Sequence, residues 1–220
     1  MQRERQRAEG PGGEHASMLE ASNSPDAIQV GATSPGVPRP GPTWDARLRG
    51  LVTALEARVP GAAGHAERVA TRSRLVARRL ELTPREVRRV ECGARVHDVG
   101  KIIVSPEILE KPGRLVPCEH AEIQRHAIFG ARLVASLQDP ELTAIVRHHH
   151  ERIDGSGYPD RLRGTEIPIG SRIVAVTDTF DALTSPRPYR EAFSPGAATE
   201  LLEDESGCTL DAEVVAAFMS

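Results

Sequence analysis

The stretch from Thr83 to Asp98 constrains the fold most, because it predicts one helix with a marked beginning and a marked end. Thr83-Pro84-Arg85-Glu86 has the pattern of a capping box with proline at the first helical position. Valines follow at helical spacing, and Gly100 is the expected C-cap. His97 and Asp98 are therefore predicted at a helix end, where side chains can reach into a cleft. Taken alone, such a pair is more often a surface histidine beside an acid than a functional site.

Helical periodicity recurs along the chain and predicts an all-α fold. Aromatic residues make up only 3% of the 220 residues, so the core must be built from Leu, Val, Ile and Ala. This composition suits packed helices, and no strong alternating strand pattern and no internal repeat is present. The pattern predicts helices over residues 44–59, 62–82, 84–98, 119–137, 140–150 and 171–183, a short helix after Ser105, and two closing helices capped by Ser194 and Asp211.

The first 43 residues differ in composition from the rest of the chain. They contain six Pro and six Gly but no Phe, Tyr or Trp, which is typical of low-complexity disorder. We therefore predict a disordered Pro/Gly-rich tail over residues 1–43 and one domain over residues 44–220.

Charge and cysteine content exclude several classes of protein. The net charge of −3 and the pI near 6.3 give no general attraction to nucleic acid polymers or anionic membranes. No apolar signal segment and no run of 18 apolar residues is present, so we expect neither secretion nor a membrane span. The three cysteines form no C-x-x-C pair, and a reducing, cytoplasmic location is expected.

Five histidines and two aspartates on successive predicted helices form the candidate site. They are His65, His97, Asp98, His126, His149, His150 and Asp178. Each alone has another explanation, such as a polar core residue, a solvated face, a cap or an ion-pair partner. Asp178 is the strongest single candidate, because the apolar residues before it predict burial and a buried carboxylate needs a cation.

Together, these seven residues suggest metal ions. Imidazole and carboxylate without cysteine favour hard-to-borderline cations, so Mn or Fe fits better than a closed structural Zn site, although Zn stays an alternative. Seven ligands are too many for one ion, whereas two divalent ions that share Asp98 use all of them. Two ions about 3.5–4 Å apart can activate water near neutral pH. A net positive charge would remain to attract a phosphodiester, and Lys101, Arg187 and Arg190 could add to it. A solvated Lys101 is an equally weighted alternative.

The chain also carries a series of short motifs in a fixed order. They are His65-x-x-Arg68-Val69, His97-Asp98-Val99-Gly100-Lys101, Lys111-Pro112-Gly113, His149-His150-Glu151-Arg152, Asp154-Gly155-Ser156-Gly157-Tyr158-Pro159, Asp178-Thr179-Phe180-Asp181-Ala182-Leu183 and Arg187-Pro188-Tyr189-Arg190. In this order, from about residue 60 to Phe218, the motifs resemble the HD-GYP domain. The chain departs from the family pattern at Ala127, usually Pro, and at Ile153, often Trp, and neither position is a candidate ligand.

The resemblance implies a helical bundle of the HD superfamily type. It also implies a metal-dependent phosphodiesterase that converts cyclic di-GMP to the linear dinucleotide or to GMP. His149 and His150 are then ligands, and His148 is a neighbour. Family members with three ions carry a Glu one helical turn before the first histidine, where this chain has Gly61. Two ions are therefore expected here.

Other residues have expected roles around the ions. Asp98 and Lys101 are the candidate catalytic residues, and Asp181, one turn after Asp178, is expected to support a ligand from behind. Substrate contacts are expected from Lys101, Tyr158, Arg187 and Arg190.

The loop Asp154–Pro159 is predicted to govern substrate entry or partner docking rather than to hold metal. Tyr158 supplies a flat ring that could stack on a guanine or anchor a partner surface. The resemblance implies that Gly157-Tyr158-Pro159 can meet GGDEF-domain diguanylate cyclases. The alternative is that Tyr158 and Pro159 only fix the loop to the bundle.

Three functional hypotheses follow. The leading one is hydrolysis of cyclic di-GMP at a centre of two ions. The second is hydrolysis of another cyclic dinucleotide or phosphate ester. The third is a regulatory module that binds cyclic di-GMP or a GGDEF-type cyclase without turnover, and the complete ligand set argues against it.

Overall fold

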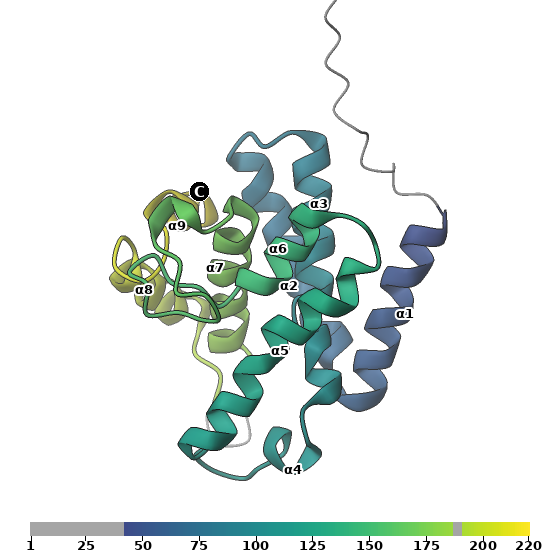
Figure 1. Ribbon diagram of the computed structural model, residues 1–220. Helices are drawn as coiled ribbons and strands as arrows, with labels where there is room; N and C mark the ends of the chain where they lie inside the picture. Colours follow the sequence, from purple (N-terminus) through teal and green to yellow (C-terminus); the bar gives the residue numbers. More distant parts are fainter. Residues whose placement is uncertain (1–41, 187–190) are drawn as a thin grey trace, which may run out of the picture. The chain divides into compact units, whose positions relative to one another are not determined.

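The computed structural model describes residues 42–186 and 191–220, and all elements within these ranges are helical (Figure 1). The expected tail lies outside the described residues except for its last two, which begin the first helix. The helices are α1 (Pro42–Arg58), α2 (Ala62–Arg79), α3 (Pro84–Val96), the 3-10 helix η1 (Val99–Ile103), α4 (Pro106–Leu109), α5 (Pro117–Ala135), α6 (Pro140–His148), the 3-10 helix η2 (Gly164–Glu166), α7 (Ile169–Thr184), α8 (Pro195–Glu205) and α9 (Ala212–Met219).

Four predicted helix starts, those of α3, α6, α8 and α9, are confirmed by their caps. The Thr83 side chain accepts from the Glu86 amide while the Glu86 carboxylate accepts from the Thr83 amide, which completes the capping box of α3. The side chains of Asp139, Ser194 and Asp211 accept amide hydrogen bonds at the starts of α6, α8 and α9. In the described residues the only ladder contact is an isolated bridge between Ser206 and Leu210, so the all-α prediction is confirmed.

Several predicted helix ends were wrong by two or three residues, and α5 and α6 end at Ala135 and His148 rather than at residues 137 and 150. Helix α2 ends at Arg79 rather than near Leu82, because the chain turns through Glu81 at a φ of 55° before α3 begins. Gly100 is not a left-handed cap: His97 is the C-cap of α3, and Gly100 lies inside η1. The structure shows another reason for glycine at position 100, which is close packing against α5.

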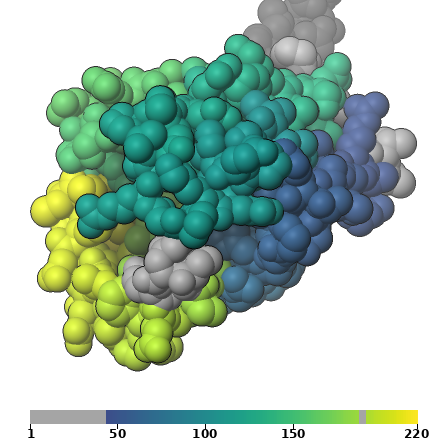
Figure 2. Space-filling model, turned by 90° about the horizontal axis from the view of Figure 1, so that it is seen from below, coloured from purple at the N-terminus to yellow at the C-terminus, as the bar shows by residue number. Residues whose placement is uncertain are grey.

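Two groups of buried apolar side chains form the core, and α3 contributes to both. The first joins α2, α3 and α7 with α9, and its centre includes Val69, Val90 and Val174. The second joins α1, α3, α5 and α6 around Val96 and Leu142. Figure 2, a view from below, shows α5 in teal between the blue N-terminal helices and the yellow C-terminal helices. None of the described helices combines the length and the apolar character needed to cross a membrane.

Candidate metal centre

The structure brings together all seven predicted ligand residues, although they come from five different helices or their ends. His65 lies on α2, His97 caps α3, and Asp98 follows it. His126 lies in the middle of α5, His149 and His150 follow α6, and Asp178 lies on α7. The side chains point into one region between the helices. Two groups can be distinguished there by their distances, and Asp98 belongs to both.

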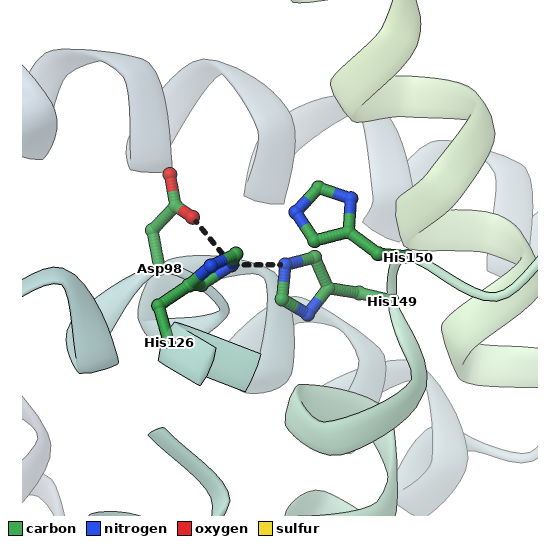
Figure 3. A group of neighbouring side chains, drawn as sticks. All are labelled: Asp98, His126, His149 and His150. Carbon is green, nitrogen blue, oxygen red and sulfur yellow. Dashed lines mark hydrogen bonds and ion pairs between the residues drawn. The ribbon is translucent and has the colours of Figure 1, made fainter. Parts of the chain in front are cut away.

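The tri-histidine group consists of Asp98, His126, His149 and His150, whose ligand atoms lie within 4.8 Å of one another (Figure 3). The His126 Nε2 atom is 3.4 Å from Asp98 Oδ1 and 3.2 Å from His149 Nε2. His126 and His149 are almost fully buried. This group offers three imidazoles and one carboxylate.

The mixed group consists of His65, His97, Asp98 and Asp178. Its His65 Nε2 atom is 3.3 Å from His97 Nε2 and 3.2 Å from Asp178 Oδ1, and His97 Nε2 is 3.4 Å from Asp98 Oδ2. Asp98 thus directs Oδ1 toward the tri-histidine group and Oδ2 toward the mixed group. Asp178 was predicted to be buried, but its side chain keeps 21% exposure at the edge of this group.

Hydrogen bonds fix the orientation of four of the candidate ligand histidines. The Nδ1 atoms of His97, His126 and His149 donate to the carbonyl oxygens of the residues three positions earlier, at 2.6–2.7 Å. The Nδ1 atom of His65 instead faces Asp181 Oδ2 at 2.8 Å. Each ring therefore directs its Nε2 atom into the region between the helices, and in the neutral form that atom carries the lone pair that metal-binding histidines need.

The donor set fits metal ions for a second reason. With both Nδ1 atoms donating to carbonyls, neutral His126 and His149 direct two lone pairs at each other across 3.2 Å. Asp98 Oδ1 is also buried and has no hydrogen-bond partner. Such an assembly of unpaired acceptors is unfavourable by itself, and a cation between them would satisfy all three.

The ionisation of His149, His150 and Asp98 is compatible with cation binding. Burial lowers the pKa of His149 and His150 well below the usual value, and the neighbouring histidines lower it further, so both imidazoles are neutral near pH 7. Burial also opposes ionisation of Asp98, but Lys101 and His97 outweigh it and hold its pKa well below normal. Neutral imidazoles and ionised carboxylates are the protonation states that metals require.

Close packing between η1 and α5 brings the two groups together. A Cβ atom at Gly100 would lie 1.9 Å from the His126 carbonyl oxygen and 2.6 Å from the Gly130 amide nitrogen. Only a residue without a side chain allows this approach. Because Asp98 immediately precedes η1, this contact sets its distance from His126.

The structure places the other predicted site residues as follows. Lys101 Nζ lies 2.5 Å from Asp98 Oδ2. The Tyr158 ring stacks on His150, with ring centroids 4.8 Å apart. Asp181 lies behind His65, as described above. Arg187 and Arg190 lie outside the described residues.

His148 does not join either group and instead faces Glu151 and Asp160, with which it forms a separate group.

Three residues around the site have roles that the sequence analysis missed. Arg68 and Arg72 both donate to Asp181, and Glu151 accepts the Asp160 and Leu162 amides. Glu151 therefore closes the loop that holds Tyr158 against His150. The spacing of His65, Arg68 and Arg72 on one face of a predicted helix could have indicated the two arginines.

Comparison with known proteins places this site within a family. A family model described as HD domain matches residues 51–214. The chain is 42% identical over 175 residues to the cyclic di-GMP phosphodiesterase response regulator RpfG of Xanthomonas campestris, covering 78% of this chain and 46% of the relative. It is 38% identical over 181 residues to the 3'3'-cGAMP-specific phosphodiesterase 3 of Vibrio cholerae, covering 80% of this chain and 39% of the relative. The chain thus spans less than half the length of these two relatives.

A solved structure supports the fold. Bd1817, an HDG"Y"P protein from Bdellovibrio bacteriovorus, superposes with a TM-score of 0.61 at 22% identity, covering 80% of this chain and 60% of that protein. The helical fold, the order of the motifs and the length of the matched region all point to the same family. The chain belongs to the HD domain family, in the HD-GYP group that its motifs resemble.

Proposed function

We propose that this chain is a phosphodiesterase that uses two divalent metal ions to hydrolyse cyclic di-GMP. The observation that carries the proposal is Asp98, whose two carboxylate oxygens face two different sets of histidines. A shared carboxylate between two sets of nitrogen and oxygen ligands is the arrangement that holds two ions close together. We propose Fe or Mn as the ions, because the donor set contains no sulfur.

Two bound ions would polarise the phosphodiester and activate the attacking water. The protein residues then have separate tasks. The tri-histidine group and the mixed group hold the ions, and the backbone carbonyls behind His97, His126 and His149 keep their rings in one orientation. With the ions in place, Asp98 no longer needs Lys101 as its counter-charge, so the Lys101 ammonium can contact a substrate phosphate. Arg187 and Arg190 are proposed as further phosphate contacts.

Tyr158 is proposed as a contact for the nucleotide or for a partner. One face of its ring is covered by His150, and Glu151 holds the loop in place. A fixed aromatic ring beside the ions can stack on a guanine. The same loop is the proposed contact for GGDEF-domain diguanylate cyclases, which would place synthesis and hydrolysis of the messenger in one assembly.

The relatives support a cyclic dinucleotide and raise a second candidate. RpfG of Xanthomonas campestris is named for cyclic di-GMP, whereas a Vibrio cholerae relative of comparable identity is named as 3'3'-cGAMP-specific. Both substrates contain two phosphodiester bonds and at least one guanine. We therefore propose cyclic di-GMP as the substrate and 3'3'-cGAMP as the alternative.

The direct test is a turnover assay with the full chain purified anaerobically. Metal content is measured first, and the protein is then incubated with cyclic di-GMP, 3'3'-cGAMP or cyclic di-AMP before chromatography of the products. We expect two ions per chain and conversion of cyclic di-GMP to the linear dinucleotide or GMP, with the highest kcat/KM among the three. Asp98→Ala is the control and should abolish turnover while lowering the metal content.

Other outcomes would contradict the proposal in distinguishable ways. A higher kcat/KM for 3'3'-cGAMP would replace the substrate but keep the reaction. Tight binding of cyclic di-GMP without turnover by fully metal-loaded protein would identify a regulatory module instead. Three ions per chain, or none under metal-replete conditions, would contradict the centre of two ions.

A further inference from the structure

A carboxylate held by two arginines lies behind His65. Asp181, only 1% exposed, faces His65 Nδ1 through Oδ2 at 2.8 Å. Arg68 donates to both carboxylate oxygens of Asp181, from Nε to Oδ1 at 2.8 Å and from Nη2 to Oδ2 at 2.9 Å. Arg72 adds a single hydrogen bond from Nη1 to Oδ1 at 2.7 Å. Two hydrogen bonds thus come from Arg68 and one from Arg72.

This support distinguishes His65 from the other oriented ligand histidines. His97, His126 and His149 donate to backbone carbonyls of their own helices, which cannot move independently. His65, on α2, depends on a side chain of α7, and that side chain depends on arginines of α2. On its Nδ1 side, His65 is therefore only as fixed as the Asp181 carboxylate.

We propose that Arg68 is a positioning residue for the ion bound in the mixed group, acting through Asp181 and His65. The inference rests on the proposed centre of two ions. The planar fork of Arg68 matches both oxygens of Asp181 and fixes the rotation of the carboxylate. A fixed carboxylate holds His65 with the proton on Nδ1 and the lone pair of Nε2 toward the ion. Arg72 contributes charge and one hydrogen bond to Asp181, and a single hydrogen bond does not fix that rotation.

Charge and geometry must be separated in the test. Arg68 and Arg72 together carry more positive charge than Asp181 carries negative, so removal of either charge would favour a nearby cation. An Arg68→Ala variant would therefore mix weaker positioning with stronger attraction for the ion. Arg68→Lys keeps the charge and loses the fork. Arg72→Lys keeps the charge at a position where one donor is sufficient, and it is the matched control.

The experiment is a titration of the metal-free full chain with Mn²⁺, followed by electron paramagnetic resonance and isothermal calorimetry. The wild-type protein should bind two Mn²⁺ and give the exchange-coupled spectrum of a close pair. Loss of support behind a metal ligand typically costs 10–100-fold in affinity, and Arg68 lies one residue further away, so Arg68→Lys should weaken one of the two binding steps roughly 10-fold. The coupled spectrum of this variant should appear only at higher Mn²⁺, while Arg72→Lys should match the wild type.

The melting temperature of the metal-free variants separates positioning from general stability. We expect Arg68→Lys and Arg72→Lys to melt at similar temperatures. If Arg68→Lys binds Mn²⁺ with wild-type affinity and gives the wild-type coupled spectrum, the positioning role is overturned, whereas the proposed centre of two ions stands. Equal losses of affinity in both lysine variants, with equal drops in melting temperature, would make the network merely structural and would also overturn it. Absence of a coupled pair in the wild type would overturn the centre of two ions and this inference with it.

Discussion

Gly100 of η1 lies directly against Gly130 of α5, so close that a Cβ atom at position 100 would be 2.6 Å from the Gly130 amide nitrogen. The contact joins the element that follows His97 and Asp98 to the helix that carries His126. The geometry of both ligand groups therefore depends on two residues that cannot bind a metal.

Replacement of Gly100 should damage the centre without removing a ligand. In Gly100→Ala, the added methyl group would meet the His126 carbonyl oxygen and force η1 away from α5. Such overpacking typically costs 1–3 kcal/mol, which corresponds to a fall of several degrees in melting temperature. We expect this fall in the metal-free protein together with a lower metal content. Gly50→Ala, at an exposed position of α1 with no atom within 4 Å of the added group, is the control and should be neutral or stabilising. Equal effects in the two variants would contradict the role of the contact.

Lys101 should matter for substrate rather than for metal. Its ammonium neutralises Asp98 in this structure, and bound ions would take over that task. A hydrogen bond to a charged group is worth about 1.5–3 kcal/mol, so Lys101→Ala should lower kcat/KM for cyclic di-GMP roughly 10- to 100-fold. Elemental analysis should still find two ions per chain. Loss of metal in this variant would show that Lys101 is needed to build the centre.

Binding of metal should become stronger as the pH rises. Burial lowers the pKa of His65, but hydrogen bonds with Asp178 and Asp181 outweigh burial and raise the pKa to about 9 in the metal-free protein. An ion must displace this proton, so the apparent affinity for Mn²⁺ should increase from pH 7 and level off above about pH 9. Calorimetry in buffers of different ionisation enthalpy counts the released protons.

The stability of the metal-free protein should follow the opposite trend. A raised pKa in the folded state stabilises the fold below the normal histidine pKa of 6.5, and this contribution disappears as the pH passes about 9. The melting temperature of the metal-free chain should therefore fall between these values. An affinity for Mn²⁺ that does not change from pH 7 to 9 would show that His65 is already neutral.

Tyr158 variants should separate its ring from its hydroxyl group. Tyr158→Phe keeps the ring that stacks on His150, whereas Tyr158→Ala removes it. We expect both variants to keep two ions, and Tyr158→Ala to bind cyclic di-GMP or a GGDEF-domain partner more weakly than Tyr158→Phe. Equilibrium binding and elemental analysis check this. An ion lost from Tyr158→Ala alone would reassign the ring to the support of His150.

Most of the fold could be predicted because its signals are local. The capping box at Thr83–Glu86 and the caps at Asp139, Ser194 and Asp211 each involve residues a few positions apart. The end of α3 was less predictable. Glycine is the residue type most often found at a C-cap, but Gly100 lies inside η1 and packs closely against α5. This packing joins segments far apart in the sequence, so no local sequence pattern reveals it.

The candidate site also has a part that could be predicted from the sequence and a part that could not. Histidine and aspartate are recognisable ligand types, so the seven candidates could be selected from the sequence and from the family resemblance. The partners of these ligands could not be selected as readily, since arginines such as Arg68 and Arg72 are common on exposed helix faces. The role of the two arginines becomes visible only in the folded structure, where α7 packs beside α2 and Asp181 accepts their hydrogen bonds. The stacking of Tyr158 on His150 likewise depends on how Glu151 folds the loop.

The candidate ligands lie on or directly after α2, α3, α5, α6 and α7, so ions at this centre would tie together segments that are far apart in the chain. Ligand binding to the folded state alone adds about 2.7 kcal/mol of stability when free metal is 100 times its Kd. That gain is a large fraction of the total stability of an ordinary domain. The ions would then act on this chain as disulfide bonds act on a secreted protein. Metal starvation in the cell would then shorten the lifetime of the protein by exposing it to proteases, and the amount of protein would fall together with the proposed activity.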